Sequence, residues 1–319
     1  MCIFAQPVVS VTDTSIFARL LPDGQQALVY QMEFESTKRN AIILPLPVGL
    51  PANEEDSLEF ISLKGYDNFF KDLNRAFPLL TVRGPSEMAR GSVYSRVKPE
   101  LVVHDVGDFV ASFVPSQADF GRLDKQFQLP KESWDKIPKY ADYGFAVFQL
   151  RKLSGKPHPM AFKFRSRFAT GDKKSIFFPT VHIHDGKVHR REKFDHTLFL
   201  QAPQYDDACG DYHRGRKLVP DLSTGYVRSI GPAKQYCQIK KSNGLLAGEQ
   251  LLHRLEMVGR FANEDVLANL AISKKNVGFK PKSFLKSSMF AVACGMAGLS
   301  WFCDRRTAVQ RKEQTSSDT

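Results

Sequence analysis

The chain has 319 residues and a formal net charge of +11, with 42% apolar and 25% charged residues. This composition is ordinary for a soluble globular protein and excludes a main body that is intrinsically disordered. The 25 phenylalanines favour packed β-sheets. We therefore expect an α+β, β-rich fold of antiparallel sheets with a few helices and a C-terminal hydrophobic helix.

The positive charge is concentrated in one part of the chain. Residues 151–193 contain twelve Lys and Arg against three Asp and Glu, whereas residues 1–90 contain eight against eleven. The basic excess is therefore a local surface feature, which indicates an anionic ligand or an acidic partner. The sequence has no glycine-rich phosphate loop and no Gly-x-Ser-x-Gly elbow, so nothing in it supports the common nucleotide-dependent chemistries.

The cysteine content favours a reducing compartment. The five cysteines are odd in number and show no disulfide-framework spacing, which is typical of reduced thiols in a cytoplasmic protein. The N-terminus lacks the cationic region of a secretory signal, so we expect no cleavable signal peptide. The cysteines are Cys2, Cys209, Cys237, Cys294 and Cys303.

Cys2 is the sharpest chemical feature of the sequence. Removal of Met1 leaves Cys2 as the first residue, and its α-amine, with an ordinary pKa of ~7.7–8, then acts as the base for its own thiol. The resulting thiolate attacks an amide carbonyl. The alternative is that Cys2 is an incidental second residue, since a single cysteine without partners is a poor predictor of catalysis.

The first residues, Cys2-Ile3-Phe4, resemble N-terminal-nucleophile hydrolases, which include amidotransferase glutaminase domains and choloylglycine hydrolases. The resemblance implies amide hydrolysis, with Arg19 and Asp23 as counterparts of the Arg and Asp that follow the first strand of the choloylglycine group. Residues 20–22, Leu-Leu-Pro, stand where that group has an asparagine-containing turn. No oxyanion-hole asparagine is therefore assigned. Residues 41–47 and 178–186 resemble segments of bacterial families of unknown function, which implies no activity.

The N-terminal half begins with strand signals. Residues 15–21 and 27–34 predict two strands joined by the turn Pro22-Asp23-Gly24, and residues 40–44 form another apolar run. Helical spacing then appears once, and a second short helix is expected at residues 131–136. The residues of the helical stripe are Tyr66, Phe69, Phe70, Leu73 and Phe77.

Strand signals dominate from residue 143 to about residue 201, and residues 251–261 favour a strand over a helix. Residues 162–168 alternate cleanly, which predicts one cationic face and one phenylalanine face. The cations are Lys163, Arg165 and Arg167. Such a row suits an anionic ligand; nucleic acid is disfavoured because base stacking needs aromatic residues on the cationic face.

The Asp185-Gly186 dipeptide predicts a two-residue hairpin. In that register His182, His184 and His189 share one face of the ribbon, and His196 points to the other. The three imidazoles suggest a zinc site, but Lys187 and Arg191 share their face and favour an anion instead. A plain solvated face is the third reading. No other cofactor is expected.

We expect a β-rich body over residues 1–270, with a subdivision near residue 140 as an alternative, and a basic tail over residues 271–319. The uncharged segment 287–303 is read as a docked helix or as a membrane anchor. Three functions stay open at this point: amide hydrolysis by Cys2, anion or partner binding by the cationic face, and a histidine metal site.

Overall fold

The structure, a computed structural model, describes residues 2–50, 57–78, 104–170, 174–211 and 225–271. These residues belong to one compact unit, Met1–Gly278. The predicted tail lies outside the described residues except for Ala271, and so does its hydrophobic segment 287–303. In the described part, no helix combines the length and the apolar character needed to cross a bilayer.

The two strands predicted near the N-terminus are confirmed. They are β2 (Ser10–Leu20) and β3 (Gln26–Glu35), which pair antiparallel. Gly24 closes the turn between them with a φ of +79°, a conformation that glycine adopts without steric cost. Most residues of both strands are buried on both faces, which explains why the sequence shows continuous apolar runs here.

Among the described residues, β2 and β3 lie inside a nine-stranded sheet with the order β14-β15-β16-β13-β2-β3-β10-β5, and β9 also pairs with β3. The sheet is mixed, because β13 runs parallel to β2 and antiparallel to β16. The other members are β5 (Leu58–Ser62), β9 (Ser154–Gly155), β10 (Met160–Phe164), β13 (Arg191–Gln201), β14 (Gly210–Asp211), β15 (Val227–Arg228) and β16 (His253–Ala262). The last of these confirms the strand predicted over residues 251–261.

A second sheet of six described strands has the order β12-β1-β4-β8-β7-β6. Strands from before and after residue 140 are neighbours in it, and β12 runs parallel to β1. Its members are β1 (Cys2–Phe4), β4 (Ala41–Leu46), β6 (His104–Val106), β7 (Phe109–Val114), β8 (Gly144–Leu150) and β12 (His182–Ile183). A separate two-stranded sheet pairs β11 (Ser175–Phe178) with β17 (Val266–Asn269).

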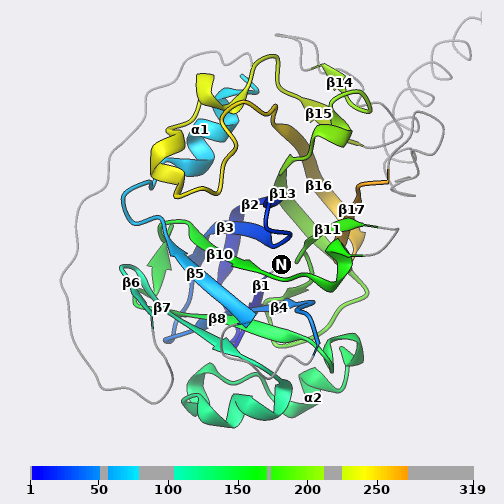
Figure 1. Cartoon of the computed structure of the whole chain (residues 1–319). Helices are drawn as coiled ribbons and strands as arrows, with labels where there is room; N and C mark the ends of the chain where they lie inside the picture. Colours follow the sequence, from blue (N-terminus) through cyan, green and yellow to red (C-terminus); the bar gives the residue numbers. More distant parts are fainter. Residues whose placement is uncertain (1, 51–56, 79–103, 171–173, 212–224, 272–319) are drawn as a thin grey trace, which may run out of the picture. The chain divides into compact units, whose positions relative to one another are not determined.

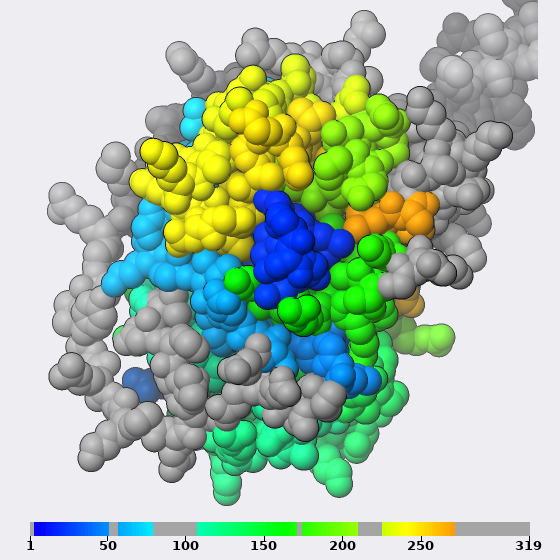
Figure 2. All heavy atoms as spheres, in the orientation of Figure 1, coloured from blue at the N-terminus to red at the C-terminus, as the bar shows by residue number. Residues whose placement is uncertain are grey.

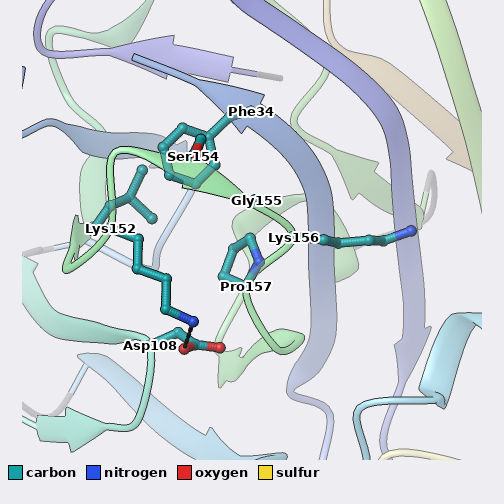
Figure 3. A pocket seen from close by; sticks show the side chains of 8 residues that line it. Phe34, Asp108, Lys152, Ser154, Gly155, Lys156 and Pro157 are labelled. Carbon is teal, nitrogen blue, oxygen red and sulfur yellow. Dashed lines mark ion pairs between the residues drawn. The ribbon is translucent and has the colours of Figure 1, made fainter. Parts of the chain in front are cut away.

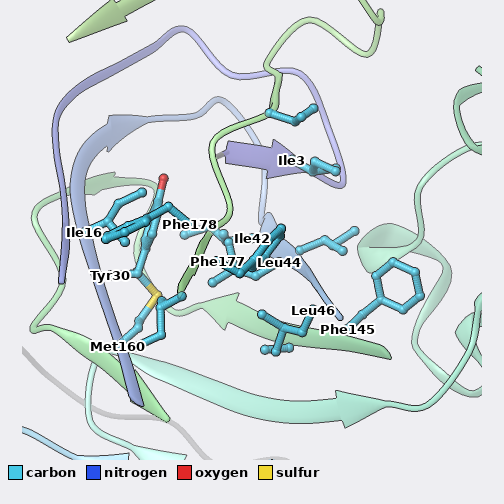
Figure 4. Packing of buried hydrophobic residues seen from close by; sticks show 14 of the residues in the cluster. Ile3, Ile16, Tyr30, Ile42, Leu44, Leu46, Phe145, Met160, Phe177 and Phe178 are labelled. Atoms are coloured by element: carbon cyan, nitrogen blue, oxygen red, sulfur yellow. The ribbon is translucent and has the colours of Figure 1, made fainter. Parts of the chain in front are cut away.

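The main core lies between the two large sheets. Figure 4 shows side chains of β1 and β4 facing side chains of β2, β3 and β10. These residues are fully buried, and burial of a Leu, Ile or Phe side chain contributes ~1.5–3 kcal/mol. The labelled examples are Ile3, Ile16, Tyr30, Ile42, Leu44, Leu46, Phe145, Met160, Phe177 and Phe178.

A second core covers the opposite face of the nine-stranded sheet. Phe17 of β2 packs edge-on against Phe69 with ring centroids 5.6 Å apart. Phe69 begins α1 (Phe69–Arg75), and the whole predicted stripe from Tyr66 to Phe77 is buried, which confirms that prediction. Residues 233–252 add buried side chains to this layer. Figure 1 shows α1 beside this yellow segment.

The remaining described helices are short. The helix predicted at residues 131–136 is confirmed as α2 (Lys131–Trp134). The 3₁₀ turns are η2 (Gln117–Arg122), η3 (Lys125–Phe127), η4 (Pro138–Tyr140), η5 (Arg167–Ala169), η6 (Pro203–Tyr205), η7 (Ala233–Gln235) and η8 (Ile239–Ser242). The described part of the chain is thus β-rich with mixed and antiparallel sheets and few helices, as expected for its coarse class.

Candidate functional site

Three histidines meet beside the N-terminal strand, of which His182 and His196 are buried and His184 is half-buried. His182 Nε2 lies 2.9 Å from His196 Nε2, and the His182 and His184 rings stack with centroids 4.8 Å apart. Phe194 covers the other side of His182 with a centroid separation of 4.3 Å. We call His182, His184 and His196 the imidazole cluster.

The cluster forms because two facing sheets each contribute to it. β12 pairs with β1, with Cys2 as the Cα partner of His182. His196 lies on β13 in the nine-stranded sheet, where alternate residues from Phe194 to Leu198 point into the core. The hydrogen bond between His182 and His196 therefore joins the two sheets across the core.

A pair of side chains after β16 holds β12 in place. Asn263 Oδ1 accepts a hydrogen bond from His182 N at 2.7 Å, and Asn263 Nδ2 donates to His182 O at 2.9 Å. Asp265 Oδ1 accepts from the backbone N–H groups of Thr180 and Val181, at 3.0 and 3.3 Å. We call Asn263 and Asp265 the side-chain clamp. The clamp provides hydrogen-bond partners for the backbone N–H and C=O groups of this segment that point away from β1.

Burial keeps the imidazole cluster uncharged near neutral pH. Desolvation lowers the pKa of His184 to about 4, and the positive charge of the amino terminus lowers it further. Desolvation also lowers the pKa of His182 and of His196, and neighbouring positive charges, including that of the amino terminus, act in the same direction. The Nδ1 atoms of His182 and His196 and the Nε2 of His184 are buried without a hydrogen-bond partner. In a neutral imidazole one ring nitrogen carries a proton and the other can accept a hydrogen bond, and a lowered pKa keeps the ring from taking up a second proton near neutral pH.

The predicted histidine hairpin is wrong. β12 pairs with β1 instead of with residues 187–190, so His189 does not join His182 and His184 on one face. His189 is 46% exposed, and its Nε2 lies 3.0 Å from Asp185 Oδ2. His196, which the hairpin register assigned to the opposite face, takes its place. No set of three or more His, Cys, Asp or Glu side chains within the described ranges is arranged to hold a metal ion.

The structure separates Cys2 from the two residues that the hydrolase resemblance paired with it. Arg19 is buried on β2, and its Nη1 donates to Leu245 O at 3.5 Å in the second core. The blue early part of the chain lies against the yellow segment that contains Leu245 (Figure 2). Asp23 caps the turn after β2, where its Oδ1 accepts from Gln25 N at 2.9 Å. Cys2 belongs to the other large sheet, beside the imidazole cluster.

The predicted cationic strand face is wrong in its geometry. β10 ends at Phe164, because Ser166 caps the turn η5 by accepting a hydrogen bond from Phe168 N. Lys163 is therefore the one cation of the row that lies on the strand, and its Nζ is 2.9 Å from Glu59 Oε2.

The two other cations of the row lie beyond β10. Arg167 Nη2 is 2.8 Å from Asp142 Oδ1, and its guanidinium covers the Tyr143 ring. Arg165 is exposed. Because Lys163 and Arg167 are each paired with a carboxylate, the row does not present three free cations to a ligand.

Lys187 and Arg191, the other predicted anion-binding residues, are exposed on the outer side of the molecule. Lys187 follows the Asp185-Gly186 turn, and its backbone N–H donates to Asp185 Oδ1 at 2.9 Å. Arg191 begins β13, and its Nη2 donates to Arg260 O at 2.7 Å on the neighbouring strand. Arg191 lies on the face of β13 opposite to His196, because the two residues are an odd number of positions apart.

A small hollow of about 60 Å³ lies elsewhere, between the turn after β8 and the loop before β10 (Figure 3). Lys152 Nζ is 3.2 Å from Asp108 Oδ1, and Lys156 pairs with Asp13. Both lysines are therefore already neutralised. The hollow suits a few water molecules better than a substrate. Its lining residues are Phe34, Asp108, Leu150, Lys152, Ser154, Gly155, Lys156 and Pro157.

No protein-family model matches the sequence. Among solved structures, baculovirus p35 is similar with a TM-score of 0.42 and 12% identity, over 82% of this chain and 96% of that chain. The caspase-8/p35 complex gives a TM-score of 0.40 and 10% identity, over 81% and 96%. A mutated baculovirus p35 after caspase cleavage gives 0.41 and 12%, over 81% and 99%. At these values the similarity assigns neither a fold family nor a function to the chain.

Proposed function

We propose that this protein is an N-terminal-cysteine amidohydrolase, in which Cys2 becomes the nucleophile after removal of Met1. The observation that carries the proposal is the register of β1 with β12, which makes Cys2 the Cα partner of His182. The N-terminal strand is thereby fixed next to three neutral imidazoles. The base in this mechanism is the α-amine of Cys2 itself, and a free terminal amine beside its own thiol is the arrangement that an N-terminal nucleophile requires.

The proposed reaction proceeds in two steps. The thiolate sulfur of Cys2 forms a bond to the carbonyl carbon of an amide, its proton having passed to the α-amine of the same residue. The C–N bond of the substrate then breaks, and the leaving amine takes the proton from the α-ammonium. Water hydrolyses the thioester, which releases the carboxylic acid and restores the thiol.

The imidazole cluster supports this chemistry in two ways. Its members are uncharged near neutral pH, so they do not oppose the protonated α-amine that forms during the first step. The Nε2 atom of His184, which is buried without a hydrogen-bond partner among the described residues, is also available for a hydrogen bond to a polar group of the substrate. By contrast, Arg19 and Asp23 are no part of the proposal, because they lie in the other large sheet and its turn.

Labelling with a chloroacetamide amide probe tests the proposed nucleophile. We expect adduct formation at Cys2 in the wild-type protein, mapped by peptide mass spectrometry, and a loss of at least ~100-fold in rate for Cys2→Ala and Cys2→Ser. Cys237→Ala is the matched control, because burial raises the pKa of the Cys237 thiol to about 12 and keeps it unreactive. A total labelling rate in Cys2→Ala equal to that of the wild-type protein, or no adduct at Cys2 in the wild-type protein, would rule the proposal out.

Metal analysis of protein purified without a histidine tag separates this proposal from the competing one, zinc-assisted hydrolysis. The cysteine mechanism predicts full probe reactivity after dialysis against a chelator. Stoichiometric zinc in the wild-type protein that is lost in His182→Ala would instead favour a metal site at the histidines.

A further inference from the structure

The outward faces of β13 and β16 carry cations directly opposite one another. Lys193 and Arg260 are Cα partners across the antiparallel pair, and both are exposed. Arg191 is the neighbour of Lys193 two positions away, and its guanidinium is held against the backbone of Arg260. We call Arg191, Lys193 and Arg260 the cationic ribbon face.

The carboxylates near the cationic ribbon face are engaged elsewhere. Asp195 Oδ2 accepts a hydrogen bond from Asp13 N at 2.9 Å, and Glu256 Oε1 lies 3.1 Å from Arg254 Nη2. Glu192 contacts His189 at 3.9 Å. In the part of the chain that the structure describes, no ion pair joins Arg191, Lys193 or Arg260 to an acid.

Like charges directly opposite each other destabilise an antiparallel pair, because their side chains approach closely on one face. Folding alone therefore does not explain why Lys193 faces Arg260. An anionic ligand that lies across both strands turns this repulsion into attraction. The cationic ribbon face also adjoins Val258, which is 69% exposed and lies two residues from Arg260 on the same side of β16.

We propose that the cationic ribbon face is a docking surface for an acidic segment of a protein partner, an activity separate from the chemistry of Cys2. Alternate residues of an extended segment are ~7 Å apart, which matches the spacing of Arg191 and Lys193 along β13. The exposed Val258 offers the apolar contact that a peptide side chain uses. Charge complementarity of this kind sets the rate and specificity of association.

A nucleic acid fits this face less well than an acidic peptide. Single-stranded binders stack bases on aromatic side chains that lie among the cations. Here the aromatic residue of β13 nearest the cations, Phe194, is fully buried on the inward face and packs against Phe261. Phe199 is on the same face of β13 as the cations, but it is fully buried in the second core against Phe70 and Phe77.

Titration of a fluorescein-labelled oligo-glutamate peptide tests the proposal. Fluorescence anisotropy at low salt is expected to show binding that weakens steeply as salt is added. Reversing both opposed charges, with Lys193→Glu and Arg260→Glu together, is expected to weaken binding at least ~10-fold. Lys38→Glu together with Arg39→Glu is the matched control, because both residues are exposed on a different part of the chain and their reversal, which changes the net charge equally, should change affinity little.

Three results would overturn the proposal. The first is unchanged affinity in the protein with Lys193 and Arg260 reversed, and the second is an equal loss when Lys38 and Arg39 are both changed to Glu, which would make the binding a net-charge effect. The third is tighter binding of a single-stranded oligonucleotide than of the peptide. Cys2→Ala should bind the peptide normally, so failure of this proposal and failure of the cysteine mechanism are distinguishable.

Thermal unfolding shows whether lost binding reflects lost folding. Lys193→Glu alone replaces a like-charge pair with an opposite-charge pair, so its Tm is expected to rise while its affinity for the peptide falls. A lower Tm would contradict the inference that Lys193 and Arg260 repel each other.

Discussion

Lowering the pH from about 7 to about 5 is expected to reduce the free energy of unfolding by roughly 5 kcal/mol, a large part of the ~5–15 kcal/mol that holds a typical domain together. The cause is the imidazole cluster. Its three members have folded pKa values below the ordinary 6.5, and that of His184 is about 4.

The sign follows from proton binding. Between pH 6.5 and about 4 the unfolded chain takes up protons on these histidines, whereas the folded chain keeps them neutral. Stability that is fully present above pH 6.5 is therefore lost as the pH falls, by ~1.4 kcal/mol per pH unit for each imidazole. Below its folded pKa a histidine is charged in both states and the loss stops.

Urea denaturation at a series of pH values measures this loss. His196→Leu and His184→Leu each remove one titrating group, so each should reduce the slope of stability against pH by about a third of the contribution from the cluster. Phe194→Leu is the control, because it changes the packing against His182 without removing a titrating group and should leave the slope unchanged. Equal slopes in the wild-type and His196→Leu proteins would contradict a neutral, buried cluster.

Asp265→Ala is expected to destabilise the protein by about 3–5 kcal/mol, because it removes the acceptor of several buried donors at once. Asp265 Oδ2 accepts from the Tyr140 hydroxyl at 2.6 Å and lies 3.2 Å from Lys139 Nζ. Its Oδ1 accepts from the backbone of Thr180 and Val181, at 3.0 and 3.3 Å. Without the carboxylate, the fully buried Tyr140 loses its partner.

Chemical denaturation of two comparison variants checks the cause. Asp265→Asn keeps one oxygen acceptor and should cost less than Asp265→Ala. Asp142→Ala removes an exposed carboxylate with a single ion pair, and we expect it to cost under ~1 kcal/mol. If Asp142→Ala and Asp265→Ala reduced the free energy of unfolding by the same amount, the buried hydrogen bonds of Asp265 would not be the cause of the loss.

The elements that the sequence predicts well are those specified by local patterns. The turn at Gly24 and the stripe from Tyr66 to Phe77 depend on neighbouring residues alone, and both are found as expected. A strand's partner is a different matter. Asp185-Gly186 does form a turn, with a Gly186 φ of +75°. However, β12 does not pair with the residues that follow this turn but with β1 at the N-terminus, which is far away in sequence.

Because β12 pairs with β1, the sequence predicts individual residues of the candidate site but not their arrangement. Cys2 and His182 were both identified from the sequence, yet nothing local places them in register. The inward direction of His196 follows from its spacing with Phe194 on β13, but its contact with His182 requires two facing sheets. The early end of the cationic strand could have been predicted from the sequence, because serine is a preferred residue at the start of a helical turn. Ser166 is such a residue, and its side chain accepts a hydrogen bond from Phe168 N at the start of η5.

The side-chain clamp and the cationic ribbon face had no comparable signal. Asn263 and Asp265 are ordinary turn residues in sequence, and their role depends on the backbone of residues 180–182. Lys193 and Arg260 become a pair only through the register of β13 with β16. In each case long-range strand pairing supplies what residue spacing does not.

Intact-mass spectrometry of the purified protein, before and after treatment with 2-cyanobenzothiazole, is the most direct test of the central claim. This reagent condenses with a free N-terminal cysteine, because it needs the amine and the thiol on one residue. The cysteine mechanism predicts a chain that lacks Met1 and gains one adduct, and Cys2→Ser gains none. A chain that keeps Met1 and gains no adduct would contradict it.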